Sequence, residues 1–165
     1  MKMGDFAYRI DHILWLLCFL LLIISVVYKL DMSSRITLTV WVIGNLVMDK
    51  AQPFVMDLAT VYEDTGPSFW YITWSAVDVL CVWCIYKIHV VHDIPASKLT
   101  RYIMVCLLSL CALQFMRYAD RMVFDTNLLS EIYKYIIVSI NISVVPFAIF
   151  WFVKDIQTLR KGVVL

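Results

Sequence analysis

Apolar residues of this chain gather into five long runs separated by shorter charged stretches. Each run is expected to be helical, because a segment that crosses hydrocarbon must satisfy its backbone hydrogen bonds internally. The expected spans are 13–29, 36–49, 67–87, 101–117 and 134–153. The pattern predicts an all-α integral membrane protein, a single transmembrane domain over residues 1–165 that forms a bundle of four or five transmembrane helices.

The number of spans depends on the second run, because Ile36 to Met48 contains only 13 residues. At about 1.5 Å per residue this run covers about 20 Å, less than the roughly 30 Å of a bilayer core. It crosses only if Asp49 and Lys50 reach to the interface or the bilayer thins. Otherwise the run is re-entrant or lies at the interface. The acidic stretch from Asp49 to Asp64 is expected to be a connection.

Composition supports lipid as the solvent of these runs. The chain is 62% hydrophobic and 16% charged, whereas a soluble domain is typically about 45–50% apolar and about 25% charged. Six Trp, nine Tyr and nine Phe suit a protein anchored at two membrane interfaces. A net charge of +1 gives no basic patch for nucleic acid. The expected partners are therefore the lipid bilayer and further copies of the chain or other membrane subunits.

The positions of Lys and Arg near the ends of the runs set the expected orientation. The 14 Lys and Arg favour the inner side by the same margin with four spans and with five. They therefore do not choose between these arrangements. Both arrangements place the C-terminus and the basic 87–101 connector on the cytoplasmic side, and both place the acidic stretch outside.

Asp78 lies near the middle of the third run, where an Asp costs about 2.5–3.5 kcal/mol on insertion scales. On a helix it shares a stripe with Tyr71 and Ser75 that continues to His89 and His92. We expect a buried polar cluster, or the wall of a pathway, that consists of Asp78, Asn45, Gln114, Asn141, Ser75 and Tyr71. The alternative is that the three amides only hold the bundle together by hydrogen bonds between helices.

Two short motifs invite a catalytic or metal-binding interpretation that their context does not favour. Cys81 and Cys84 form a C-x-x-C pair inside a run, and the exterior connections contain no Cys that could exchange with it. His89 and His92 lie one turn apart but have no Cys or Glu at ligand spacing. No phosphate loop, H-E-x-x-H or G-x-S-x-G motif is present. We therefore expect no enzyme activity, no cofactor and no metal.

Two functions fit these observations. The first is an oligomeric channel or pore-forming protein with a polar pathway near Asp78. The alternative is a non-enzymatic accessory, immunity or interaction subunit of a membrane complex, which the lack of catalytic motifs and of a sizeable soluble part favours. A carrier that uses Asp78 as a proton acceptor is a third hypothesis, although carriers usually show repeated halves that this chain lacks.

Overall fold

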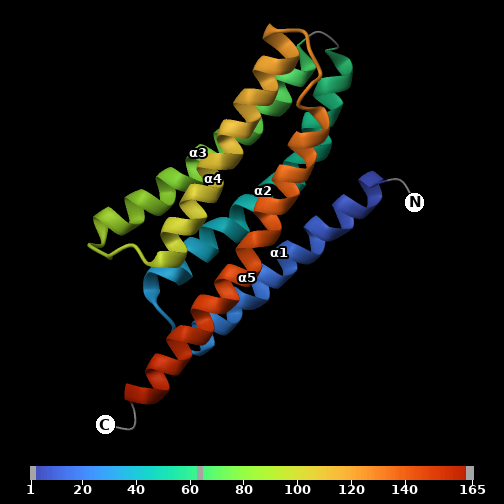
Figure 1. Cartoon of the computed structure of the whole chain (residues 1–165). Helices are drawn as coiled ribbons and strands as arrows, with labels where there is room; N and C mark the ends of the chain where they lie inside the picture. The colour runs from blue at the N-terminus through green and yellow to red at the C-terminus, as the bar shows by residue number, and fades with distance from the viewer. Residues whose placement is uncertain (1–2, 63–64, 163–165) are drawn as a thin grey trace.

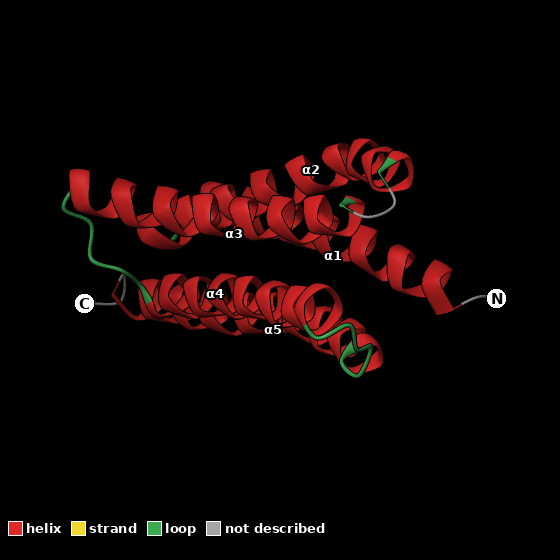
Figure 2. Cartoon of the chain, turned by 90° about the horizontal axis from the view of Figure 1, so that it is seen from above, coloured by secondary structure: helices red, strands yellow, loops and turns green. Residues whose placement is uncertain are grey.

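The computed structural model describes residues 3–62 and 65–162, and all regular structure in these ranges is helical. The elements are α1 (Met3–Val27), α2 (Met32–Val61), α3 (Gly66–Val91), α4 (Lys98–Tyr118), the π-helix η1 (Ala119–Val123) and α5 (Ser130–Gly162). Helix α3 packs between α2 and α4, and α1 packs against α2 and α5. Figure 1 shows the helices lying along one another, and Figure 2 shows α1, α2 and α3 in one layer above α4 and α5.

Three helical stretches of the described chain are long and apolar enough to cross a membrane. They are Gly66–Val91, Lys98–Val123 and Ile132–Thr158. Leu16–Val27 of α1 is a shorter apolar stretch. The all-helical architecture expected from the sequence is therefore confirmed, and the third, fourth and fifth predicted runs coincide with these stretches.

Helix α2 differs from the sequence-based expectation. It continues for 30 residues from Met32 to Val61, or about 45 Å at the usual rise. The expected end near residue 49 is therefore wrong, and most of the acidic stretch is helical, including Pro53. Packing along α3 outweighs the local stop signals, as is common for helices in proteins. Val55, beyond those signals, is buried.

The two ends of the bundle carry different elements, and we call them the His89 end and the Arg117 end. The His89 end holds the last residues of α1 and α3 and the first residues of α2 and α4. The Arg117 end holds the last residues of α2 and α4 and the first residues of α3 and α5. The apolar core between the ends draws on all five α-helices and includes Cys18, Leu38, Trp41, Ile85, Ile103, Leu107, Val144 and Ala148.

Helices α2 and α3 approach each other closely where Gly44 faces Cys81. A Cβ atom on Gly44 would lie 2.6 Å from the Cys81 Sγ atom, so a side chain at this position would require the Cys81 thiol to move. Small residues such as glycine commonly let two membrane helices pack backbone to backbone. The contact fixes how far α3 slides along α2, and with it the depth of the buried face of α3.

Gly44→Ala is accordingly expected to destabilise the bundle by about 1–3 kcal/mol, the usual cost of overpacking. Thermal unfolding in detergent, followed by circular dichroism, measures the effect. The double variant Gly44→Ala/Cys81→Ala should recover most of the loss, because alanine lacks the Sγ atom that the new methyl group meets. Additive effects of the two single substitutions would contradict the direct contact.

Candidate polar site in the bundle interior

The buried face of α3 carries Asp78 at its centre. The Asp78 side chain is 2% exposed, and its Oδ1 atom has no hydrogen-bond partner among the described residues. Tyr71, Ser75 and His89 are buried on the same helix. The stripe expected from helical periodicity therefore points into the bundle from Tyr71 to His89, whereas His92, which was expected to continue it, is exposed.

Asp78 lies among small polar and sulfur-containing side chains from α3 and α4. The Cys111 thiol of α4 interacts with Ser75 and lies within electrostatic range of Asp78. Cys81 lies within the same range of Asp78 from the next turn of α3. We call Ser75, Asp78, Cys81 and Cys111 the Asp78 cluster. In such surroundings an unpaired carboxylate is costly, and a protonated carboxyl group is much less so.

Gln114 and Tyr71 meet through a residue of α5 that the sequence did not single out. The Tyr133 hydroxyl donates to Gln114 Oε1 over 2.6 Å. The Tyr71 ring lies edge-on to the ring of Tyr133, with 6.4 Å between centroids, and it contacts Tyr118 in the same way at 6.3 Å. These residues form a polar aromatic layer on the Arg117 side of the Asp78 cluster.

The two asparagines do not join the expected cluster. Asn45 donates to the Trp41 carbonyl of its own helix over 2.8 Å. Asn141 is half-buried on α5, a helix that packs on α1 and α4. In the described chain no hydrogen bond links either amide to Asp78. Similar expected depths did not bring Asn45 and Asn141 to Asp78, because the depth of a residue does not determine which face of its helix the side chain occupies.

A buried ion pair closes the Arg117 end. Arg117 donates to Asp120 and to Asn127, and both charged side chains are 6% exposed. Asp120 also accepts from the Thr126 hydroxyl and from the Leu129 backbone N–H. Arg117 ends the fourth predicted run, a position from which a long cationic side chain can reach the membrane interface. Instead, the π-helix η1 places Asp120 where it can neutralise Arg117 inside the turn between α4 and α5.

Hydroxyl groups fill the His89 end. Ser33 Oγ lies 2.7 Å from His89 Nε2 and 2.7 Å from Thr100 Oγ1. Thr37 donates to the Ser33 carbonyl, and the Ser97 backbone N–H donates to Ser33 Oγ. Sequence reasoning identified only His89 here. The available signal was weak, because Asp31 and Ser97 also serve as ordinary N-caps of α2 and α4.

The described residues contain no group of three or more His, Cys, Asp or Glu side chains placed to hold a metal ion.

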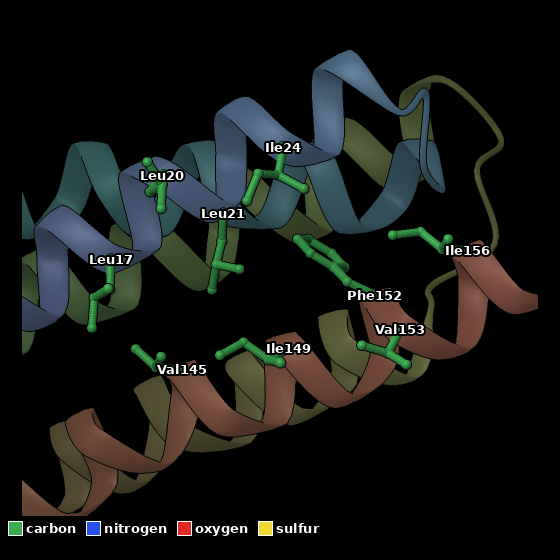
Figure 3. Close-up of a pocket in the computed structure, with 9 residues that line it drawn as sticks. All are labelled: Leu17, Leu20, Leu21, Ile24, Val145, Ile149, Phe152, Val153 and Ile156. Carbon is green, nitrogen blue, oxygen red and sulfur yellow. The ribbon is translucent and has the colours of Figure 1, made fainter.

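A cavity of about 330 Å³ lies between α1 and α5, as Figure 3 shows. Its lining is entirely apolar and consists of Leu17, Leu20, Leu21, Ile24, Val145, Ile149, Phe152, Val153 and Ile156. Hydrocarbon fits this lining, and polar ligands do not.

Comparison with known proteins gives no further guide, since no family model, curated protein or solved structure matches the chain.

Proposed function

We propose that this chain is a multi-pass integral membrane protein of the channel type that carries protons through its own helix bundle, with its C-terminus on the cytoplasmic side. The observation that carries the proposal is Asp78, a carboxyl group 2% exposed, with an oxygen that lacks a hydrogen-bond partner in the described chain. Ionisable residues inside membrane helices commonly serve proton relays. A carboxyl group with one oxygen that lacks a hydrogen-bond partner can bind and release a proton at that oxygen without breaking an ion pair.

The polar face of α3 points into its own bundle, which favours a proton route within one copy of the chain over a pore between copies. Asp78, Ser75 and Tyr71 all face the interior, whereas the lipid-facing side of α3 carries Val79, Leu80 and Trp83. An opening between subunits would therefore be lined by apolar residues, even if the protein assembles into the oligomer expected from its sequence. Pathways for hydrated ions need open space, while protons need only hydrogen-bonding groups and occasional water.

Polar groups mark the route at three levels of α3. Tyr71 lies with Gln114 and Tyr133 near the Arg117 end, the Asp78 cluster lies in the middle, and His89 lies at the other end. Fully buried Ile85 separates Asp78 from His89. Transport therefore requires a second conformation in which water enters between α3 and α4, so the present arrangement corresponds to a closed state.

Proton flux into liposomes tests this function. Vesicles with purified protein, a potassium gradient and valinomycin should acidify at a rate that rises with protein content. Asp78→Asn should reduce that rate by about tenfold or more, equivalent to at least about 1.4 kcal/mol in the barrier. Asp57→Asn is the matched control, since Asp57 is an exposed carboxyl group on α2 and its loss should leave the flux unchanged.

The interaction-subunit alternative has one observation in its favour. Large apolar side chains are exposed at the Arg117 end, including Phe124 at 69% and Leu128 at 81%, together with Val61, Tyr62 and Val123. A partner protein could cover this tip. Absence of proton flux from the wild-type protein, together with a stoichiometric partner recovered in mild detergent, would replace the proton proposal with this one.

A further inference from the structure

A continuous chain of hydrogen bonds connects buried His89 with the surface. From His89 Nε2 it passes to Ser33 Oγ (2.7 Å), Thr100 Oγ1 (2.7 Å), Ser97 Oγ (3.0 Å) and Ser34 Oγ (3.1 Å). It ends at Asp31 Oδ2, 3.1 Å from Ser34 Oγ. The first three steps have normal hydrogen-bond lengths, and the last two, at 3.1 Å, are slightly longer than the roughly 2.5–3.0 Å that is usual for O–H···O bonds.

The chain crosses three helices and joins buried groups to an exposed carboxylate. Ser33 and Thr100 are fully buried, and Ser34 and His89 are nearly so. Ser97 is half-buried at the start of α4, and Asp31 is exposed before α2. A path that runs from a surface carboxylate to an enclosed imidazole is more than is needed to cap two helices. Asp31 and Ser97 could cap α2 and α4 without any contact between Ser97 and Ser34.

The positions of the protons follow from the terminal groups. The Ile85 carbonyl lies 2.6 Å from His89 Nδ1 and can only accept, so Nδ1 carries the hydrogen. His89 Nε2 is then free to accept from the Ser33 hydroxyl. At the other end, the Asp31 carboxylate can only accept, so Ser34 donates to it. The intervening hydroxyls can each donate in either direction.

We propose that Ser34, Ser97, Thr100 and Ser33 form a proton wire between Asp31 and His89. Once a proton binds at Asp31 Oδ2, the Ser34 hydroxyl turns from Asp31 to Ser97. Asp31 then donates its proton to Ser34 Oγ, and the Ser34 hydroxyl proton passes to Ser97. The same exchange moves a proton from Ser97 to Thr100, from Thr100 to Ser33, and from Ser33 to His89 Nε2. Each hydroxyl gains one O–H bond and loses one, so the net change is one proton moved from the carboxyl group to the imidazole.

The product state keeps its hydrogen bonds. The imidazolium donates through Nδ1 to the Ile85 carbonyl and through Nε2 to Ser33 Oγ, which are both acceptors. In the described chain no charged side chain is hydrogen-bonded to His89, so the imidazole is reached through hydroxyls alone. Charged and titratable groups around the wire lie farther out at this end: Lys29 after α1, Arg35 on α2, Lys87, His92 and Asp93 at the end of α3, Lys98 and Arg101 on α4, and Asp155 on α5, which lies within electrostatic range of Asp31.

The role of the wire, although not its existence, rests on the proposed function, since the wire would deliver protons to the route that passes Asp78.

The existence of the wire is tested by nuclear magnetic resonance of protein with ¹⁵N-labelled histidine in lipid nanodiscs. The ring nitrogens of His89 should report the Nδ1–H tautomer. Their exchange with solvent protons should slow by about tenfold in Thr100→Val, which keeps the shape of the side chain and removes the hydroxyl.

Thr39→Val is the matched control, because the Thr39 hydroxyl donates only to the Arg35 carbonyl of its own helix, outside the wire. Ser34→Ala gives a second break and should slow exchange in the same way if Thr100→Val fails to fold. Equal exchange rates in Thr100→Val and Thr39→Val would overturn the wire and show that water reaches His89 directly.

These results separate the wire from the proposed function. The exchange measurement needs no gradient, so slowed exchange supports the wire even where liposomes show no proton flux. Wild-type flux that depends on Asp78 but is equal in Thr100→Val and Thr39→Val would retain the proposed function and reject the wire as its inner path.

Discussion

Replacing Ser33 with alanine is expected to lower the free energy of unfolding by about 2–4 kcal/mol, because several buried polar groups lose their partner at once. Ser33 is completely buried, and its hydroxyl contacts His89 Nε2, Thr100 Oγ1 and the Ser97 backbone N–H. Thr100 can turn to Thr37 or Ser97. His89 Nε2 and the Ser97 N–H have no such substitute partner in the described chain.

Ser25→Ala provides a closely matched comparison. Ser25 is equally buried, but its hydroxyl donates only to the Leu22 carbonyl of its own helix. That carbonyl already belongs to the helix, so removal of the hydroxyl should cost less than about 1 kcal/mol. Denaturant titration in a mild detergent measures both variants. Equal losses of stability would show that burial of the side chain matters at these two positions and that the network does not.

Asp78→Leu is expected to act in the opposite direction, raising the free energy of unfolding while abolishing proton flux. A central carboxyl group costs about 2.5–3.5 kcal/mol on insertion scales, and some overpacking by leucine offsets the gain, so a net increase of about 1–2 kcal/mol is expected. The unpartnered Oδ1 atom is the physical reason, since no hydrogen bond is lost from it in the described chain.

The same denaturant titration measures the free energy of unfolding of Asp78→Leu, and the liposome assay measures its proton flux. Ser75→Ala serves as the control for altered packing in the Asp78 cluster, because it removes a neighbouring buried hydroxyl without touching the carboxyl group. A marked loss of stability in Asp78→Leu would show that the carboxyl group holds the helices together. In that case its role in proton movement would be the weaker interpretation.

Hydropathy alone predicted α3 and α4 to within a few residues, because each is a helix long and apolar enough to cross a membrane. Helical periodicity also placed Tyr71, Ser75, Asp78 and His89 on one buried face. Helix α2 was cut short because Asp49, Lys50 and Pro53 resemble a helix end. In the folded chain, contacts with α3 sustain the helix through that segment.

The partners of the polar residues could not be predicted. Ser33 meets Thr100 across 67 positions of sequence, and such a meeting depends on how far one helix slides and turns against another. Close contacts such as that of Gly44 with Cys81 limit how far one helix can shift along the other. The sequence does not show which residue of the neighbouring helix such a glycine contacts. Hydroxyls at helix starts are ordinary N-caps, so nothing in the sequence distinguishes those that have a second role.

The length of α2 has a consequence for how the protein sits in a membrane. Thirty residues make a rod of about 45 Å, whereas bilayer hydrocarbon is about 30 Å thick. Transmembrane helices lean by roughly 20° on average, which shortens their vertical reach very little. In the proposed bilayer setting, several turns of this helix must therefore stand clear of the acyl chains. Lys50 and Asp57 are exposed along the second half of α2. This half of the helix would therefore extend out of the membrane and hold the Arg117 end away from the acyl chains.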